Sequence, residues 1–535
     1  MTGTNSHAAP RFAAGAVTVC VLAIAAAALY ATRLQQAPVY LASDEIKFAL
    51  QARSVAATGR SLDGQFLPLY FSEPGFTAGR DPISIYATAL SLAVLPFSES
   101  AIRLPTAVVA VIDVVLMFLV AGRIFRRPWL ATLAAVLLAL TPGHLIYGRM
   151  AVDVLYPLPF LLGWMLCLLA YLDRGRLPAL FAATLLLGLG VYAYIAFLVM
   201  APIYMVLTAL LIWQRRSVRA YLTAAAGFIL PLTLLVNWYV RHPHQYSDLI
   251  GAYHLYDPRL SPLQGGKDLS SYFSLSVRSG VYWDFFNPSF LFFSGDSSVM
   301  NSTRLAGVFL WPVAFFLIAG IHRAVVRRSP LEIALLAGLF TSPLAAVLLA
   351  EVALRRALVM LPFAILLATS GVEVLVGARR LAVRVAAVTL LLVIPVQFRS
   401  FYLDYMGDYR VRSGIWFGGN IRDALVGAMQ RAPHGPSSRV YVADSIPFAD
   451  SYWRFYAIAH GREDLVPTFR DIRQPEAGAV PGPALLVVDL ASAPPMAVLR
   501  AAGWNQVQVV TEPNGTPSFA IYDKIKGGPV AGQQP

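Results

Sequence analysis

Long runs of apolar residues alternate with short polar segments over the first three quarters of the chain. Each run is about as long as a helix needs to cross roughly 30 Å of hydrocarbon. The pattern predicts eleven membrane-spanning helices, near residues 12–31, 104–121, 129–146, 155–172, 177–191, 193–213, 221–240, 304–321, 330–350, 356–376 and 385–398. The first run is interpreted as an uncleaved anchor, although its alanine-rich end also fits a signal peptide. The fifth and sixth runs are separated only by Gly188, Gly190, Tyr192 and Tyr194.

Composition supports a polytopic membrane protein and explains the positive charge. The chain is 57% hydrophobic and 13% charged, with a formal net charge of +13, far more apolar than a soluble domain. The five short loops expected inside (122–128, 173–178, 214–220, 322–329 and 377–384) hold 14 Arg in 36 residues, whereas the long loops 33–103 and 241–302 hold 10 Lys and Arg in 133. This is the inside-positive bias. The positive net charge therefore reflects the membrane topology of the loops, and no nucleic-acid partner is expected.

The two long outer loops have different patterns. Residues 44–58 show helical spacing and end at Gly59, which is placed as a C-cap, and a second amphipathic segment starts after Asp81-Pro82. Both predict helices that lie in the membrane interface. Loop 241–302 is rich in aromatic residues, which suit either the lipid headgroup layer or stacking on a sugar ring.

The composition changes after residue 398, where apolar strands begin to alternate with helical pieces. The sequence predicts a transmembrane domain over 1–398, a linker with a short helix over 399–437, an extracytoplasmic α/β domain over 438–524 and a flexible tail over 525–535. The fold class is thus a polytopic α-helical membrane protein with about eleven transmembrane helices, interfacial helices in the first outer loop, and a small C-terminal α/β domain. The only cysteines, Cys20 and Cys167, lie in apolar spans and offer neither a disulfide framework nor a metal site.

Two adjacent carboxylates, Asp44 and Glu45, follow the first span on the outer side. Sugar transfer needs a carboxylate beside the acceptor and cations beside a departing phosphate. Because neighbours on a helix point about 100° apart, one of the pair is expected to act as the base. The other is expected to be a charge that stabilises the helix N-terminus.

Further polar groups gather at expected outer membrane edges. Arg149 and Asp153 lie in the loop 147–154, and Glu351, Arg355 and Arg356 lie between the ninth and tenth spans. Arginines at an outer edge oppose the inside-positive trend, so a lipid phosphate is one expected partner, and a headgroup contact or an ion pair with Glu351 is the other.

One acid, Asp113, lies within the second span. It is interpreted as an acid hydrogen-bonded between helices, with a proton relay as the alternative. No histidine spacing predicts a metal site, and nothing requires a cofactor or metal, although Asp44, Glu45 and Asp153 could together hold a divalent ion.

The chain resembles the polyprenyl-phosphate-dependent glycosyltransferases of the C superfamily, in particular glycosyltransferase family thirty-nine, which contains protein O-mannosyltransferases and lipid A aminoarabinose transferases. The segments that carry this resemblance are Asp44-Glu45, the run from Gly59 to Leu69, Arg103-Leu104-Pro105, Thr141-Pro142-Gly143-His144 with Arg149 and Asp153, Phe292 to Asp296, and Arg355-Arg356 through Pro362.

The resemblance implies roles for individual residues. It makes Asp44, with Glu45 beside it, the catalytic base or acceptor binder, and it makes Asp153 the important acid of the second outer loop. Arg355 or Arg356 would contact the lipid phosphate. The lipid A enzymes have a Lys-Pro-Pro stretch where this chain reads Gly79-Arg80-Asp81-Pro82, so Arg80 is expected to replace the lysine. Tyr86, in the segment that follows, joins the substrate-binding candidates.

These observations predict an inverting transferase in the inner membrane of a bacterium. It would move a hexosyl or pentosyl unit from a polyprenyl-phosphate donor to a lipid, glycan or protein acceptor of the cell envelope, on the periplasmic face. The predicted catalytic residues are Asp44, Glu45 and Asp153. The predicted substrate-binding residues are Arg80, Tyr86, Arg149, Arg355 and Arg356. A transporter or flippase is an alternative that would require related halves and several intramembrane charges. A non-catalytic subunit that binds polysaccharide through its outer domain is another.

Overall fold

The computed structural model describes residues 8–524, except 74, 75, 434–438, 474, 475, 477, 478 and 493–495. It is mostly helical, and its contacts divide the chain into two compact units. The membrane unit contains residues 1–32, 59–87 and 103–404, and the α/β unit contains residues 33–58, 88–102 and 405–535. The predicted domain boundary at residue 398 lies inside one continuous helix, Leu381–Met406.

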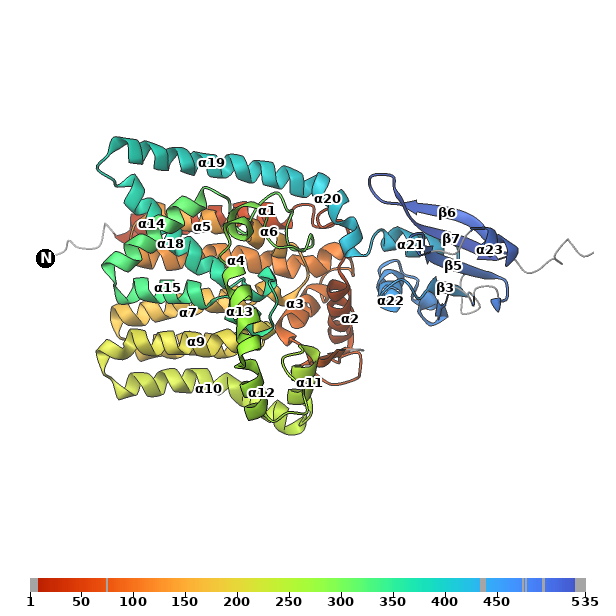
Figure 1. Cartoon of the computed structure of the whole chain (residues 1–535), viewed down its shortest axis with the longest axis horizontal. Coiled ribbons are helices and arrows are strands. Elements are labelled where there is room, and N and C mark those ends of the chain that lie inside the picture. Colours follow the sequence, from red (N-terminus) through yellow and green to blue (C-terminus); the bar gives the residue numbers. More distant parts are fainter. Residues whose placement is uncertain are drawn as a thin grey trace, which may run out of the picture. The chain divides into compact units, whose positions relative to one another are not determined.

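Helices of very different lengths form most of the membrane unit (Figure 1). They are α1 (Ala8–Ala31), α4 (Glu99–Phe125), α5 (Pro128–Ala139), α6 (Pro142–Tyr147), α7 (Pro157–Arg174), α8 (Leu177–Gly190), α9 (Ile195–Ile212), α10 (Val218–Arg241), α14 (Val313–Arg327), α15 (Pro330–Thr341), α16 (Leu344–Leu348), α17 (Leu354–Ala357), α18 (Met360–Val376) and α19 (Leu381–Met406). Within the described residues, six helical segments are long and apolar enough to cross a membrane. This result agrees with a multi-pass membrane protein. The number of eleven spans stays a prediction.

Several predicted spans are helices interrupted by proline. Residues 129–146 divide into α5 and α6 at Thr141-Pro142, and residues 330–350 divide into α15 and α16 at Pro343. Proline lacks the N–H that a continuing helix needs, so it begins a new helix instead. The two adjacent runs 177–191 and 193–213 are separate helices, since α8 ends at Gly190 and α9 begins at Ile195.

The predicted span 304–321 is helical only from Val313. Its first residues form an irregular loop, in which the N–H groups of Val308 and Phe309 donate to the carbonyls of Phe290 and Leu291. Gly307 allows this approach, because a Cβ atom there would lie 2.4 Å from backbone atoms of Phe292. This apolar stretch therefore forms part of a buried loop.

Small residues set the closest helix crossing. At the contact of α14 with α18, a Cβ on Gly320 would lie 1.8 Å from the carbonyl oxygen of Leu367, and a Cβ on Gly371 would lie 1.8 Å from that of Phe316. Small residues at helix interfaces let backbones approach in this way.

The loops of the membrane unit contain elements that periodicity did not predict. Loop 59–87 forms a hairpin of β1 (Phe71–Glu73) and β2 (Phe76–Arg80), which pair antiparallel before α3 (Pro82–Leu92). Loop 241–302 contains α11 (Gln245–Ala252), α12 (Pro262–Leu269), α13 (Tyr272–Asp284) and the π-helix η3 (Ser289–Phe293).

The α/β unit is built on a five-stranded sheet with the order β4-β3-β5-β7-β6. β3 runs parallel to β4 and β5, and β7 runs antiparallel to β5 and β6. The strands are β3 (Val440–Ala443), β4 (Phe469–Ile472), β5 (Ala484–Asp489), β6 (Asn505–Thr511) and β7 (Pro517–Lys524). The helices are α2 (Ser43–Thr58), α20 (Asp408–Ser413), α21 (Ile421–Arg431), α22 (Ala449–Ala459) and α23 (Met496–Ala501).

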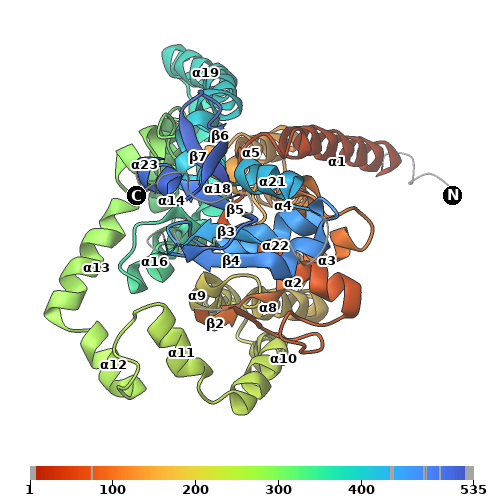
Figure 2. The ribbon, with the colours of Figure 1, turned by 90° about the vertical axis from the view of Figure 1, so that its right-hand side faces the viewer.

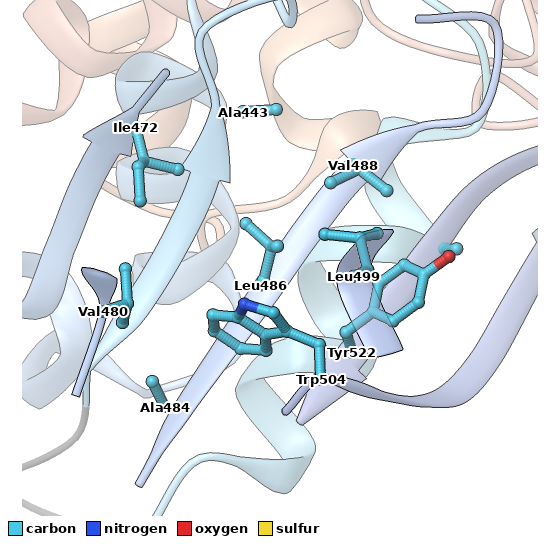
Figure 3. Close-up of a cluster of buried hydrophobic side chains, with 10 residues drawn as sticks. Ala443, Ile472, Val480, Ala484, Leu486, Val488, Leu499, Trp504 and Tyr522 are labelled. Carbon is cyan, nitrogen blue, oxygen red and sulfur yellow. The ribbon is translucent and has the colours of Figure 1, made fainter. Parts of the chain in front are cut away.

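One face of this sheet is covered by a cluster of buried apolar side chains (Figure 3). Trp504 and Leu486 form its middle, and Leu499 of α23 packs on them. The sheet and its helices also provide a base for the first loop, because α2 packs against α22, which itself contacts β4 (Figure 2). The helix after the first predicted span therefore belongs to the same compact unit as the C-terminal residues.

Candidate functional site

The predicted acidic pair begins helix α2 in the α/β unit. The backbone N–H of Ala42 donates to the Glu45 carboxylate over 2.9 Å, and the Glu45 side chain is fully buried. This is the reciprocal half of a capping box, in which the acid at the third helical position satisfies a free N–H. Asp44 is partly exposed. The geometry thus supports Glu45 as the helix-stabilising charge and Asp44 as the carboxylate accessible to a substrate.

Two buried acids lie near one another in the membrane unit. Asp153 begins a short 3-10 turn (Asp153–Leu155), and Asp81 immediately precedes the first residue of α3. Their exposed fractions are 9% and 6%. The backbone N–H of Ile195, at the start of α9, donates to the Asp81 carboxyl, while burial and the negative charge of Asp153 raise its pKa well above the usual range. Asp81 therefore caps α9 and favours the protonated form.

Arg356 is the predicted cation that the structure places beside these acids. Its guanidinium donates to the Tyr194 hydroxyl over 3.4 Å and to Glu351 over 3.3 Å, and it lies 5.1 Å from the ring centre of Tyr253. Burial and the charge of Asp81 raise the pKa of Tyr253 to about 12, although Arg356 opposes this shift. Its neighbour Arg355 pairs with Glu351 and is more exposed.

The unpredicted hairpin brings Arg80 into the same neighbourhood. Arg80 pairs with Glu73 over 2.5 Å, and its guanidinium lies 4.1 Å from the ring centre of Phe76. Phe76 in turn contacts Tyr253 edge-on, with 5.8 Å between ring centres. The membrane unit therefore brings together Arg80, Asp153 and Arg356, three residues that the sequence singled out separately.

Two cavities flank this group. The smaller, of about 150 Å³, has an apolar wall from α9, α11 and α16, and Arg356 and Tyr253 also line it. The larger, of about 610 Å³, is lined by Tyr86, Tyr192 and Trp238 together with the polar side chains of Asn237 and Arg241. Ligand cavities typically combine such apolar and aromatic walls with a few polar groups.

The wall of the larger cavity contains a free donor. The indole N–H of Trp238 is buried without a hydrogen-bond partner among the described residues. Tyr70 contacts the Trp238 ring with 5.6 Å between ring centres, and the charge of Asp81 contributes to raising the pKa of Tyr70, after burial. Tyr86 uses its hydroxyl to donate to the Pro68 carbonyl over 2.7 Å. Tyr86 therefore shapes this cavity rather than joining the charged group.

Arg149 occupies a different environment. It has no exposed surface, and it donates to the carbonyls of Leu29 and Tyr30 over 3.2 Å and 2.9 Å. These carbonyls belong to the last turn of α1, where a cation offsets the helix dipole. This geometry fits a structural role, so Arg149 is not part of the proposed substrate site.

The intramembrane acid Asp113 is part of a buried hydrogen-bonded chain. Its carboxyl lies 3.3 Å from Nε2 of His144, and Nδ1 of His144 lies 2.6 Å from the hydroxyl of Tyr30. The acid is thus bonded between α4 and α6, as the sequence interpretation expected. Over the described part of the chain, no group of three His, Cys, Asp or Glu side chains is placed to hold a metal ion.

Sequence reasoning missed three members of the charged group: Asp81, Tyr194 and Tyr253. Asp81 precedes a helix-initiating proline and therefore looks like an ordinary N-cap, and the tyrosines looked like interface aromatics. The one available signal was the departure at Gly79-Arg80-Asp81-Pro82, where an acid stands between a cation and a proline.

Residues 78–239 match the family described as dolichyl-phosphate-mannose-protein mannosyltransferase. The matched range contains Arg80 and Asp153 but neither Asp44 nor Arg356. No curated protein matches the sequence.

Solved structures of two kinds of membrane enzyme share the fold. ArnT from Cupriavidus metallidurans bound to undecaprenyl phosphate has a TM-score of 0.51 and 15% identity, over 96% of this chain and 99% of that chain. Its apo state has a TM-score of 0.53 and 14% identity, over 95% and 98%. The Archaeoglobus fulgidus oligosaccharyltransferase, tethered with an acceptor peptide that contains the NVT sequon, has a TM-score of 0.52 and 14% identity, over 95% of this chain and 74% of that chain.

At 14–15% identity, these structural matches establish the fold alone. Together with the family match over residues 78–239, the shared fold supports glycosyl transfer as the general activity. The chain therefore has the fold of the C-superfamily glycosyltransferases, and the resemblance drawn from its motifs is confirmed.

Proposed function

We propose that the protein is an inverting glycosyltransferase of the bacterial inner membrane. It takes one sugar from a polyprenyl monophosphate and transfers it to a lipid, glycan or protein acceptor on the periplasmic face. The observation that carries this proposal is the apolar cavity of about 150 Å³ with Arg356 on its lining. An apolar wall beside a cation is what a lipid chain that ends in a phosphate requires.

In this mechanism Arg356 binds the donor phosphate, with Arg355 beside it and Arg80 close to the same Tyr253. The bond between the anomeric carbon and the phosphate oxygen breaks, and the polyprenyl phosphate leaves with the electron pair. Cationic donors aimed at the departing phosphate stabilise the charge that develops on it. A phosphate held by arginine is a better leaving group than one exposed to water.

Asp44 is proposed to accept the proton of the acceptor hydroxyl while that oxygen attacks the anomeric carbon. The single displacement inverts the configuration, and Asp44 afterwards releases the proton to water. Asp153 is proposed to act in the same site, close to Asp81 and Tyr253. The cavity of about 610 Å³ is proposed to receive the acceptor, because its aromatic wall and the polar side chains of Asn237 and Arg241 suit a sugar or a polar headgroup.

The proposed steps use only side chains of the protein and the two substrates. The proposal therefore expects transfer to survive removal of divalent ions by EDTA. Complete loss of transfer in EDTA, restored by a divalent ion, would instead assign an ion to the reaction.

The proposal is tested by Asp44→Asn in membranes supplied with a radiolabelled polyprenyl-phosphate sugar. Loss of a general base typically lowers the rate by roughly 10²- to 10⁴-fold. Glu463→Gln is the matched control, because Glu463 is an exposed acid of the same unit that pairs with Arg53 of α2. Full transfer by the Asp44 variant defeats the assignment.

A further inference from the structure

We infer that the α/β unit is a working part of the transferase, because its C-terminal residues hold the helix that carries Asp44. This inference rests on the proposed role of Asp44. It assigns Tyr452 and Glu512 as positioning residues, which act on the reaction through α2. Both lie more than 400 positions from Asp44 in the sequence.

The first of these contacts lies directly before α2. The hydroxyl of Tyr452, on α22, donates to the carbonyl of Leu41 over 2.9 Å, and Tyr452 is buried. Leu41 is three residues before Asp44. Burial and the charges of Glu45 and Asp44 raise the pKa of Tyr452, so its hydroxyl keeps the proton that it donates.

The second contact connects three segments that are far apart in the sequence. The Glu512 carboxylate accepts from the Tyr40 hydroxyl over 2.8 Å and from the backbone N–H of Asn420 over 2.8 Å. The side chain of Asn420 also donates to the carbonyl of Thr511 over 2.8 Å. Tyr40 is 1% exposed. A partly buried carboxylate that accepts several hydrogen bonds favours one arrangement of the groups around it.

A third set of contacts holds other residues of the first loop. The ammonium group of Lys47, on α2, lies 3.7 Å from the ring centre of Phe448. Glu99, from the other loop segment of this unit, accepts from the Tyr456 hydroxyl over 3.1 Å and pairs with Arg422 over 3.4 Å. The two segments of the first loop that belong to this unit, 33–58 and 88–102, are therefore bound to the C-terminal residues at several positions.

These contacts bear on the reaction because α2 cannot hold its own position. Most of the stability of a helix in a protein comes from tertiary packing, so the placement of this 16-residue helix depends on its contacts. A catalytic group misplaced by about 1 Å can cost roughly 10²-fold in rate. Releasing the start of α2 from α22 should therefore lower the rate of the chemical step, although every group that touches the donor phosphate remains.

The experiment compares Tyr452→Phe, Glu512→Ala and Glu512→Gln with Arg53→Gln in the full-length protein. Arg53 is the matched control, because its pair with Glu463 joins α2 to the same C-terminal residues through side chains that are 40% and 60% exposed. Exposed pairs contribute little to stability. For each variant, kcat, the KM for the polyprenyl-phosphate sugar and the melting temperature are measured.

We expect Tyr452→Phe and Glu512→Ala to lower kcat by roughly 10- to 100-fold with a KM within about twofold of the native value. Glu512→Gln should restore part of the lost activity, since its single amide oxygen can still accept from Tyr40 although the hydrogen bond from the Asn420 N–H is then lost. Arg53→Gln should match the native protein. A native kcat in the Tyr452 and Glu512→Ala variants overturns the inference, as does a loss that only follows the melting temperature.

The same assay separates this inference from the proposed function. If Asp44→Asn abolishes transfer while the Tyr452 and Glu512 variants remain fully active, only the positioning role fails. If Asp44→Asn is itself fully active, the proposed role of Asp44 fails, and the reaction no longer requires α2 to hold Asp44 in place.

Discussion

Asp81 lies in a buried environment that disfavours an ionised carboxylate. Its pKa is raised by burial and by Asp153, so the folded protein prefers its protonated form. For a raised pKa, the stabilising contribution is complete below the unfolded value of about 4 and is lost as the pH rises through the folded value. Asp81→Asn keeps an acceptor for the N–H of Ile195 and cannot ionise.

We therefore expect the melting temperature of Asp81→Asn to fall less than that of the native protein between about pH 5 and 8. Thermal unfolding in detergent across this range measures the difference. Asp257→Asn is the control, because the carboxyl of Asp257 is exposed and should leave the pH dependence unchanged. Equal pH dependence for the native protein and the Asp81 variant would contradict this account.

Arg356 and Arg355 provide a second test at the scale of residues. The Arg356 side chain is 11% exposed and lines the apolar cavity, whereas the Arg355 side chain is 38% exposed and pairs with Glu351. A hydrogen bond to a charged group contributes about 1.5–3 kcal/mol. Arg356→Gln should therefore raise the KM for the donor by roughly 10- to 100-fold.

Arg355→Gln should change the KM much less, because its side chain is more exposed than that of Arg356 and does not line the apolar cavity. Steady-state kinetics with the polyprenyl-phosphate sugar measure both variants. An equal effect of the two substitutions would show that the phosphate is bound elsewhere, or that both arginines contact it.

Some candidate site residues could be singled out from the sequence because their position was unusual. Arg355 and Arg356 oppose the charge bias of membrane loops, and an acidic pair directly after a span is poor core material. Tyr194 and Tyr253 carried no such signal, because tyrosine is common at membrane interfaces. Their part in the charged group depends on contacts between segments far apart in the chain, which local pattern does not encode.

Among elements, the crossing of α14 and α18 depends on two glycines. A Cβ on Gly371 would lie 1.8 Å from the carbonyl oxygen of Phe316, so the helices must move apart to accept alanine. Overpacking of this kind typically costs about 1–3 kcal/mol. Gly371→Ala should lower the melting temperature in detergent.

Gly280→Ala is the matched control for this substitution. Gly280 also lies in a helix, α13, and a Cβ there meets nothing within 4 Å. Alanine is the better helix former by about 1 kcal/mol, so this variant should be as stable as the native protein or more stable. A Gly371 variant as stable as the Gly280 variant would show that the helices separate at no cost.

The apolar pattern located the helices well, and it located their ends poorly where tertiary contacts override it. The helix over residues 44–58 with Gly59 as its C-cap was predictable, and α2 ends at Thr58 with Gly59 at φ +70°. The pairing of residues 308 and 309 with 290 and 291 was not, because an apolar segment of a buried loop has the same pattern as a span. The edge strand β4 was missed because Arg470 and Asp471 interrupt its apolar pattern, as charges on edge strands often do.

At the scale of the whole molecule, the proposed topology places the loops 33–103 and 241–302 on the periplasmic side. The test uses single cysteines in a protein whose Cys20 and Cys167 are replaced by alanine. Ser270→Cys lies in the second long loop and Gln214→Cys lies in a short arginine-rich loop, and both positions are exposed.

A membrane-impermeant maleimide should label Ser270→Cys in intact spheroplasts, because the positive loops are retained inside. It should label Gln214→Cys only after the membrane is permeabilised. The reverse pattern would put the long loops in the cytoplasm and remove the periplasmic reaction.

The central claim is that this chain moves a sugar from a polyprenyl monophosphate by single displacement. The most direct measurement incubates the purified protein with a polyprenyl-phosphate sugar of known anomeric configuration and membranes as acceptor. It follows released polyprenyl monophosphate by mass spectrometry and the new glycosidic bond by NMR. The account predicts one polyprenyl monophosphate for each sugar transferred, with inverted configuration. A retained configuration, or no release of polyprenyl monophosphate, would contradict it.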